Sequence, residues 1–505
     1  MKRLLSLCII VFMACQAPSN PNPPSEVLNA LDEASLKEHL TYISSDEMKG
    51  RETGSPELKK VAEFLSNKLK SYGYKGLGEN GSFLQPFTLV ENTYDFSSLT
   101  MGYKNALKVR LNENTLIYNR NKTSLSYSND VVFVGEGLYT SDRQDYSKDD
   151  INGNIVFRYS LSEETKNAFP NEGDRKIFRY LTDSLGAVAV ITVLSDSEAD
   201  TKAFNQYKHF SGGKSMMFGN AAPKPTAILI KESVAKQFYK ADRKKTFKGL
   251  KSFKLKYKFQ LTLNATSTNI HTQNVVAHLK GSDANRAHEY VAYGSHYDHV
   301  GVKDGEIYNG ADDDGSGTVA VLEMAKAISK NPPKRSTMII FHTGEEKGLL
   351  GSKYYSENQL VKMENIVAMF NMDMIGRSAD KIKENDNTRL TLGNEIYVIG
   401  ADKISHELHT ISEKMNDEFV KMDLNYALNE ESHPARIYYR SDHWNYAKHG
   451  VPVIFYFDGI HEDYHKPTDT VEKIDFNKIK NVSKLALATG YYVSNKDARI
   501  VIGTK

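Results

Sequence analysis

Three stretches between residues 290 and 341 decide the fold class: YVAYGSH at 290–296, GADDDGSGTVAVLEMAKAIS at 310–329 and MIIF at 338–341. The first and third are near-continuous apolar runs, which are typical of strands buried on both faces of a sheet. The middle stretch is a glycine-rich turn followed by a helical apolar pattern. Similar apolar runs recur at 275–277, 366–370 and 451–457. Alternating buried strands and helices predict an α/β domain with a largely parallel central sheet.

Acidic and histidine residues follow several of these predicted strands. His296 ends one strand, Glu345 and Glu346 follow a second, and Asp373 follows a third. Ligands of open α/β sheets gather at the carboxyl ends of the strands, so we expect these side chains to share one crevice. With His465, they form a set of imidazoles and carboxylates that zinc and similar ions accept. A spare carboxylate among them would suit metal-assisted hydrolysis as a base.

Two of these acidic segments also have simpler interpretations. The spacing of Asp312, Asp314, Ser316 and Glu323 nearly fits a calcium-binding helix-loop-helix loop, but that motif needs an entering helix. Residues 300–311 carry three glycines and no helical stripe, so a turn that presents a carboxylate fits better. Adjacent glutamates alone would indicate only a favourable helix-dipole interaction. Because other residues of metal-ligand type are expected nearby, we interpret the glutamate pair as part of a metal site.

Length and charge limit the classes of protein to which the chain could belong. The chain has 505 residues, of which 40% are hydrophobic, enough for two or three globular domains. Lys plus Arg (65) nearly balances Asp plus Glu (63), which argues against a nucleic-acid partner. The most basic stretch, 240–258, alternates apolar and lysine residues from Phe253 onward. This pattern predicts a half-buried strand with a solvated basic face.

The first residues have the pattern of an export signal. Lys2 and Arg3 precede an apolar run, Leu4–Met13, that is too short to span a bilayer. The segment resembles a bacterial lipoprotein signal in which Cys15 is lipidated, although Phe12 departs from the usual leucine; an ordinary signal peptide is the alternative. We expect a signal at 1–15, a tether at 16–29, and export to the periplasm, outer membrane or cell surface. The lipid anchor would be the only membrane attachment, and Cys8 and Cys15 are the only cysteines, so no internal disulfide is expected.

The sequence also predicts the structure of two further regions. Ser55 is a candidate N-cap before Pro56, and an apolar stripe from Leu58 to Tyr72 ends at Gly73, which predicts a helix. Residues of about 90–265 contain short strand-like runs, many turn residues and one helix-plus-strand unit at 175–194. This region is predicted to be a separate, mostly β module.

Residues 274–480 resemble the co-catalytic zinc exopeptidase family that includes bacterial leucyl aminopeptidases, aminopeptidase Y and glutamate carboxypeptidase. The matching stretches are GSHYD at 294–298, GADDDGSG at 310–317, GEEKGLLG at 344–351, NMD at 371–373, SDH at 441–443 and DYHKPTD at 463–469. Their order and approximate spacing match the family, as does the segment SSDEMKGR at 44–51. The resemblance implies a three-layer zinc-exopeptidase domain with a mixed, largely parallel sheet.

The resemblance also implies roles for seven residues. Two zinc ions would share Asp313; one would add His296 and Asp373, and the other Glu346 and His465. Glu345 would be the general base that takes a proton from a bridging water, and Asp298 would orient His296. The implied activity is hydrolysis of the N-terminal peptide bond of a peptide substrate.

The region at 91–265 resembles, more loosely, the protease-associated module inserted in some relatives. The match rests on DVVFVGEG at 130–137, INGNIV at 151–156 and SLGAVAV at 184–190. The implied division is an N-terminal part of the peptidase domain at 30–90, the insert at 91–265, and the zinc core at 266–500. By analogy, the insert would limit access to the cleft by size.

Other functions remain open from the sequence. A carboxypeptidase or dipeptidase could use the same site, with Arg436 or Arg440 holding a substrate carboxylate. A glutaminyl-cyclase-like transferase shares the fold but works with one zinc. A non-catalytic binding ectodomain should lack ligands, and the full set implied by the family is present. The aminopeptidase is the preferred prediction.

Overall fold

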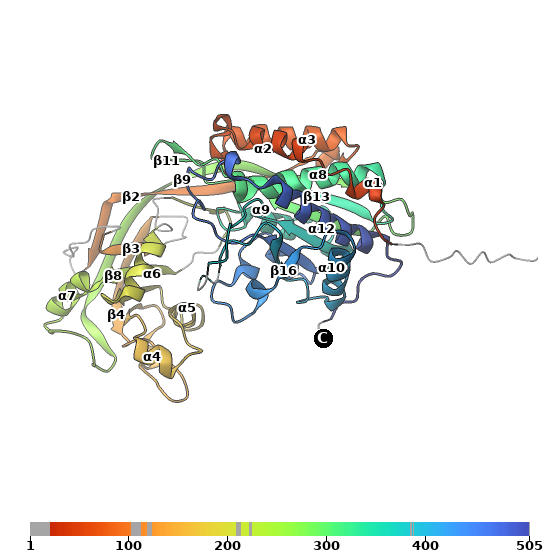
Figure 1. Cartoon of the computed structure of the whole chain (residues 1–505). Coiled ribbons are helices and arrows are strands. Elements are labelled where there is room, and N and C mark those ends of the chain that lie inside the picture. The colour runs from red at the N-terminus through yellow and green to blue at the C-terminus, as the bar shows by residue number, and fades with distance from the viewer. Residues whose placement is uncertain are drawn as a thin grey trace, which may run out of the picture. The chain divides into compact units, whose positions relative to one another are not determined.

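The structure is a computed structural model that describes residues 21–102, 113–118, 124–208, 214–221, 225–383, 386 and 388–503. The predicted signal at 1–15, with Cys15, lies outside these residues. The chain divides into two compact units (Figure 1): one contains the residues up to Phe87 and from Thr272 onward, and the other is Thr88–His271. No helix in the described part of the chain combines the length and apolar character needed to cross a bilayer.

The first unit is built on a mixed sheet whose central strands are parallel. The order is β16-β15-β17-β14-β10-β13-β9, and β17, β14, β10 and β13 run parallel to one another. β9 and β15 pair antiparallel at the two sides of this parallel core. The strand bounds are β9 Phe253–Leu279, which continues from the second unit, β10 Tyr290–His296, β13 Ser336–His342, β14 Ile366–Met372, β15 Glu395–Ile399, β16 Asp423–Asn425 and β17 Val453–Phe457. The predicted α/β class with a largely parallel sheet is confirmed.

Helices cover both faces of this sheet. Ile339 and Phe341 of β13 point into one apolar core, and Met338 and Ile340 point into another, as the two-residue period of a strand requires. The first core includes residues of α1 Ser25–Leu28, α2 Glu33–Ile43, α3 Pro56–Ser71, α8 Gly317–Lys330, α10 His406–Phe419 and α12 Phe476–Asn495. Helices α2, α3 and α8 lie side by side in Figure 1. The second core includes residues of α9 Leu350–Glu357 and α11 Trp444–Ala447.

The N-terminal helices follow their sequence signals. The Ser55 hydroxyl accepts a hydrogen bond from the Leu58 N–H, and Pro56 opens α3, as predicted. The α3 residues Leu58, Val61, Ala62, Leu65 and Leu69 are buried. Ser25–Leu28 fall inside the expected tether, yet they form α1, in which Val27 and Leu28 are buried.

The second unit is a sheet with helices on its connections. β4 Leu125–Phe133, β5 Ile155–Tyr159, β6 Ala189–Leu194 and β8 Thr226–Lys231 are parallel neighbours, and β2 Leu84–Gly102, β3 Thr115–Tyr118, β7 Lys214–Phe218 and β9 form antiparallel pairs. Its helices are α4 Glu163–Ala168, α5 Asp174–Arg179, α6 Glu198–Lys208 and α7 Glu232–Ala241, so it contains more helix than the single helix-plus-strand unit predicted. In β9, Lys254 is exposed and Leu255 buried, in the predicted alternation.

Candidate metal centre

Parallel strands bring the predicted site residues to one edge of the sheet. His296 is the last residue of β10, whose neighbours are β13 on one side and β14 on the other. Glu345 and Glu346 lie in the turn between β13 and α9, and Asp373 directly follows β14. His465 lies in the loop after β17. The carboxyl ends of these strands therefore converge, as strand polarity predicts.

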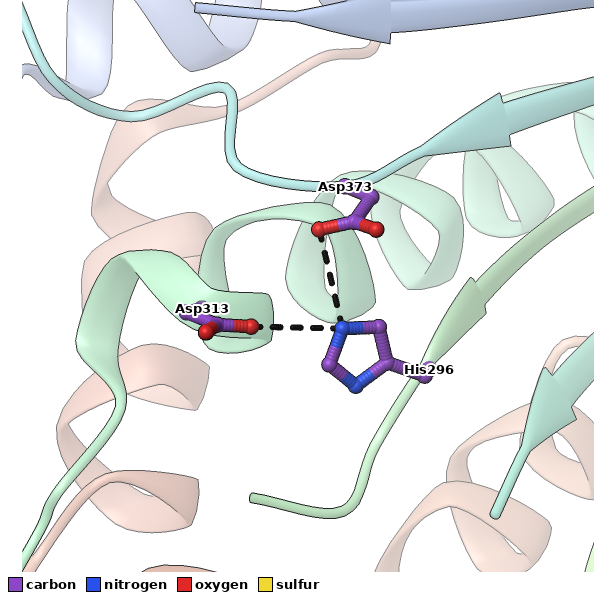
Figure 2. A group of neighbouring side chains, drawn as sticks. All are labelled: His296, Asp313 and Asp373. Atoms are coloured by element: carbon purple, nitrogen blue, oxygen red, sulfur yellow. Dashed lines mark ion pairs between the residues drawn. The ribbon is translucent and has the colours of Figure 1, made fainter. Parts of the chain in front are cut away.

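One group of side chains surrounds the imidazole of His296 (Figure 2). His296 Nε2 lies 3.3 Å from Asp313 Oδ1 and 3.6 Å from Asp373 Oδ1. All three residues are buried, and one ligand atom from each lies within 4.8 Å of the others. This spacing is short enough for the three atoms to bind one ion. The Ser441 hydroxyl donates a hydrogen bond of 2.5 Å to Asp373 Oδ2, which leaves Oδ1 facing the imidazole.

A second group lies on the other side of Asp313. His465 Nε2 is 3.1 Å from Asp313 Oδ2 and 3.0 Å from Glu346 Oε2. The His465 ring stacks on Tyr464 with its centroid 3.9 Å away. Asp313 therefore presents one carboxylate oxygen to each group. This is the arrangement that a carboxylate shared by two ions needs.

Of the three consecutive aspartates, only Asp313 faces both groups. Asp312 Oδ1 accepts from the Gly376 N–H, and Asp314 accepts from the N–H groups of His296, Gly317 and Met374. The triplet lies in a kinked turn, Ala311–Ser316, in which Asp313 and Asp314 depart from helical dihedral angles, and this turn leads directly into α8. The residues before it form a hairpin, β11 Val302–Lys303 with β12 Glu306–Ile307, and not the entering helix of a calcium loop.

Asp298, the residue expected to orient His296, contacts its ring through the main chain. His296 Nδ1 lies 3.0 Å from the main-chain oxygen of Asp298, whereas its distance to the carboxylate Oδ1 is 3.8 Å. A proton on Nδ1 that binds this carbonyl leaves Nε2 free to act as a ligand. The Asp298 carboxylate instead accepts from the Thr53 hydroxyl at 2.7 Å and from the Glu345 N–H at 3.2 Å. It therefore holds the backbone of the predicted base.

His299 is a member of the cluster that the sequence analysis missed. Its side chain is fully buried, and Nδ1 lies 2.9 Å from Glu346 Oε1 and 3.8 Å from Asp313 Oδ2. The signal was a second histidine three residues after His296. That signal alone does not show that the ring reaches the cluster, because its position depends on the distant segment around Glu52. Ser441, which binds Asp373, is a further residue of the site for which the sequence indicates no role.

The electrostatics of the cluster fit a bound cation. Asp313, Glu345, Glu346 and Asp373 are all buried or nearly so, and buried carboxylates are stable only when paired or bound to a metal. Burial raises the pKa of Glu345 well above its ordinary value, with nearby carboxylates adding to the rise and His296 opposing it. Burial works against a charged His465, but Glu346 and Asp313 raise its pKa to about 10. His465 Nε2 and Glu346 Oε1 have no hydrogen-bond partner among the residues that the structure describes, and this set of nitrogen and oxygen donors fits divalent ions.

Comparison with known proteins identifies the class. Residues 274–490 match the family model "Peptidase family M28". A probable leucine aminopeptidase of Trichophyton verrucosum is 29% identical over 221 residues, which cover 41% of this chain and 54% of the relative. Aminopeptidase YwaD of Bacillus subtilis is 28% identical over 247 residues, covering 46% and 47%. The resemblance to the co-catalytic zinc exopeptidases is therefore confirmed for this part of the chain.

Solved structures share the fold over most of the chain. An aminopeptidase from Aneurinibacillus sp. strain AM-1 has a TM-score of 0.59 at 21% identity, covering 95% of this chain and 98% of that one. The zinc aminopeptidase BSAP from Bacillus subtilis has a TM-score of 0.51 at 19% identity, covering 93% and 98%. In sequence, the chain spans about half the length of the two curated relatives above.

Proposed function

We propose that this protein is a zinc-dependent aminopeptidase that removes the N-terminal residue of peptides. The observation that carries the proposal is the pair of ligand groups that share the buried Asp313, with Glu345 beside them. The names of the relatives and of the solved neighbours, leucine aminopeptidase and zinc aminopeptidase, support this choice of substrate and metal.

Two zinc ions would be held by five residues. His296, Asp313 and Asp373 would bind one ion, and Asp313, Glu346 and His465 the other. When bound, the ions would polarise the peptide carbonyl and lower the pKa of water in the site. Two groups orient these ligands: the Ser441 side chain, which binds Asp373, and the main-chain carbonyl of Asp298, which binds His296.

Glu345 would carry out the proton transfers. Its Oε2 is 3.9 Å from His296 Nε2, so its carboxylate borders the first ligand group. It takes a proton from the attacking water as the new C–O bond forms at the peptide carbonyl. It then gives this proton to the leaving nitrogen as the C–N bond breaks, which releases an amino acid and a shortened peptide.

Metal analysis with and without chelation tests this proposal directly. We expect about two zinc ions per purified chain, and we expect hydrolysis of amino-acid anilides to stop after chelation and to return with added zinc. Elemental analysis and anilide release measure the two effects on the same sample. Purified protein that hydrolyses anilides equally well after complete zinc removal would contradict the proposal.

A cavity beside the ligand groups provides a place for the substrate side chain. Asp313, Glu345 and Asp373 line it on one side. The rest of the lining is largely apolar, with Met374, Ile437, Phe455, Phe457 and Ile460. These walls support a preference for an apolar N-terminal side chain.

Arg440 favours a second candidate, a carboxypeptidase or dipeptidase. It lines the same cavity, and its guanidinium forms no ion pair with any residue that the structure describes. A free guanidinium can bind a substrate carboxylate through two parallel hydrogen bonds. Arg436, the other candidate, lies over the Tyr439 ring at 4.5 Å.

Blocked peptides separate the two candidates. An aminopeptidase is expected to cleave peptides with a free amine and an amidated C-terminus, and to leave N-acetylated peptides intact. Arg440→Leu should then change kcat/KM for the amidated peptides by less than about tenfold. If N-acetylated peptides with a free carboxylate are cleaved, and Arg440→Leu lowers that rate by about 10- to 100-fold, the second candidate is correct. Peptide release followed by mass spectrometry measures both rates.

A further inference from the structure

We propose that His299 is an additional ligand of the ion held by Glu346 and His465, which gives that ion four protein ligands. This inference rests on the proposed zinc site. Two observations carry it: His299 Nδ1 is aimed into the ligand group, and the backbone at His299 is fixed by a neighbouring segment.

The first observation is the set of distances around the second group. His299 Nδ1 lies 2.9 Å from Glu346 Oε1 and 3.8 Å from Asp313 Oδ2. One ligand atom each from His299, Asp313 and Glu346 lies within 4.8 Å of the others. The His299 and His465 rings have centroids 5.7 Å apart and interplanar angle 72°. Two imidazoles and two carboxylates therefore border the same space.

Misaligned contacts distinguish ligands from hydrogen-bonded partners. Although His299 Nδ1 is close to Glu346 Oε1, neither atom forms a hydrogen bond of regular geometry with any residue that the structure describes. His465 Nε2 behaves in the same way: it lies 3.0 Å from Glu346 Oε2 without forming a hydrogen bond. Close approach without alignment is expected when atoms point at a common cation. His299 thus approaches Glu346 as closely as the family-implied ligand His465 does, and it lies somewhat farther from Asp313.

The backbone holds His299 in this position. Glu52 and His299 form a parallel β-bridge, and the His299 N–H donates to the Arg51 carbonyl at 3.1 Å. The ring lies against Gly310, where an added Cβ would come within 2.5 Å of His299 Cγ. A glycine at 310 is therefore required for the ring to lie where it does.

A fourth protein ligand makes the two positions unequal. Four protein ligands complete the tetrahedral shell that zinc prefers, whereas three leave a place for water or substrate. The position with His299 and His465 is then closed, and the position with His296 and Asp373 is open. We expect the closed position to hold its zinc more tightly, so that stepwise chelation removes the other ion first.

The number of imidazoles bound to zinc tests the inference. X-ray absorption at the zinc edge of the two-zinc protein is expected to show three imidazoles shared by two ions in the wild type, and two in His299→Gln. Chelator competition should show at least about a 100-fold loss of affinity at one position in His299→Gln, because even a change in a residue behind the ligands costs 10- to 100-fold. The wild-type measurement needs no variant to fold.

His39→Gln is the matched control, because His39 is also buried and its Nδ1 also lacks a hydrogen-bond partner. His39 packs against Phe64, 5.5 Å between ring centroids, and should bind no metal. Its substitution is expected to leave the imidazole count and both affinities unchanged. Two zinc ions with only two imidazoles in the wild type would overturn the role of His299 and leave the proposed function standing. Wild-type protein that binds no zinc would overturn both.

Discussion

Glu345→Gln is expected to lower kcat/KM for amino-acid anilides by about 10²- to 10⁴-fold, the contribution typical of a positioned general base. Zinc content should not change, because all of the proposed ligands remain in place. The substitution keeps the size of the side chain and the Glu345 N–H, which the Asp298 carboxylate accepts at 3.2 Å. Only the ability to accept and return a proton is lost. Anilide kinetics and elemental analysis on the same preparation measure the effect.

Glu346→Gln is the matched comparison for this experiment. The two residues are adjacent, but Glu346 lies 3.0 Å from His465 Nε2, whereas Glu345 borders the His296 group. We expect Glu346→Gln to lose zinc together with activity. If Glu345→Gln retains activity within about tenfold of the wild type, or loses zinc as Glu346→Gln does, the proton-transfer role of Glu345 is wrong.

The sequence predicted the fold because its local signals agree with the tertiary structure. Runs such as 338–341 are buried on both faces, so they read as strands without any knowledge of the neighbours. The carboxyl ends of parallel strands meet at one edge, so His296 and Asp373 could be placed together despite their separation in sequence. The second unit was less predictable, because its short helices α4 and α5 have only six residues each and weak periodicity.

Contacts made by backbone atoms could not be predicted from the sequence. The resemblance implies that Asp298 orients His296 but not through which atom, and in the structure the main-chain oxygen of Asp298 lies 3.0 Å from His296 Nδ1. That choice depends on the turn after β10, which residue types alone do not determine. His299 was missed for a related reason: it reaches the site only because residues 50–52 run alongside it. Pairing between segments so distant in sequence leaves no local pattern.

Arg51 makes the link between those segments, and its substitution should have the largest effect on stability. Its buried guanidinium donates to the carbonyls of Tyr297, Ile43, Asn309 and Gly310 and to the Ser44 hydroxyl. Lys49, Gly50 and Arg51 all have positive φ, between 43° and 67°, a conformation that L residues adopt only when contacts impose it. Arg51 therefore fixes a strained turn against the loop that carries His299.

Arg51→Met is expected to destabilise the first unit by about 3 kcal/mol or more, because several buried carbonyls lose their donor at once. Trp444, the only tryptophan, lies in this unit between Tyr438 and Tyr439. Its fluorescence should report a fall of about 1 M in the urea midpoint of metal-free protein. Arg51→Lys, which keeps the charge but not the planar fork, should recover only part of this loss.

Arg335→Met separates general destabilisation from an effect on the site. Arg335 is also buried, and it binds Glu289 at 2.6 Å and the carbonyls of Val493 and Lys496. Both variants should unfold at lower urea concentration, since both leave buried acceptors without donors. Only Arg51→Met should also weaken zinc binding, because the Arg51 carbonyl accepts from the His299 N–H. Equal zinc affinity in the two variants would mean that the turn at 49–51 stabilises the fold without positioning the site.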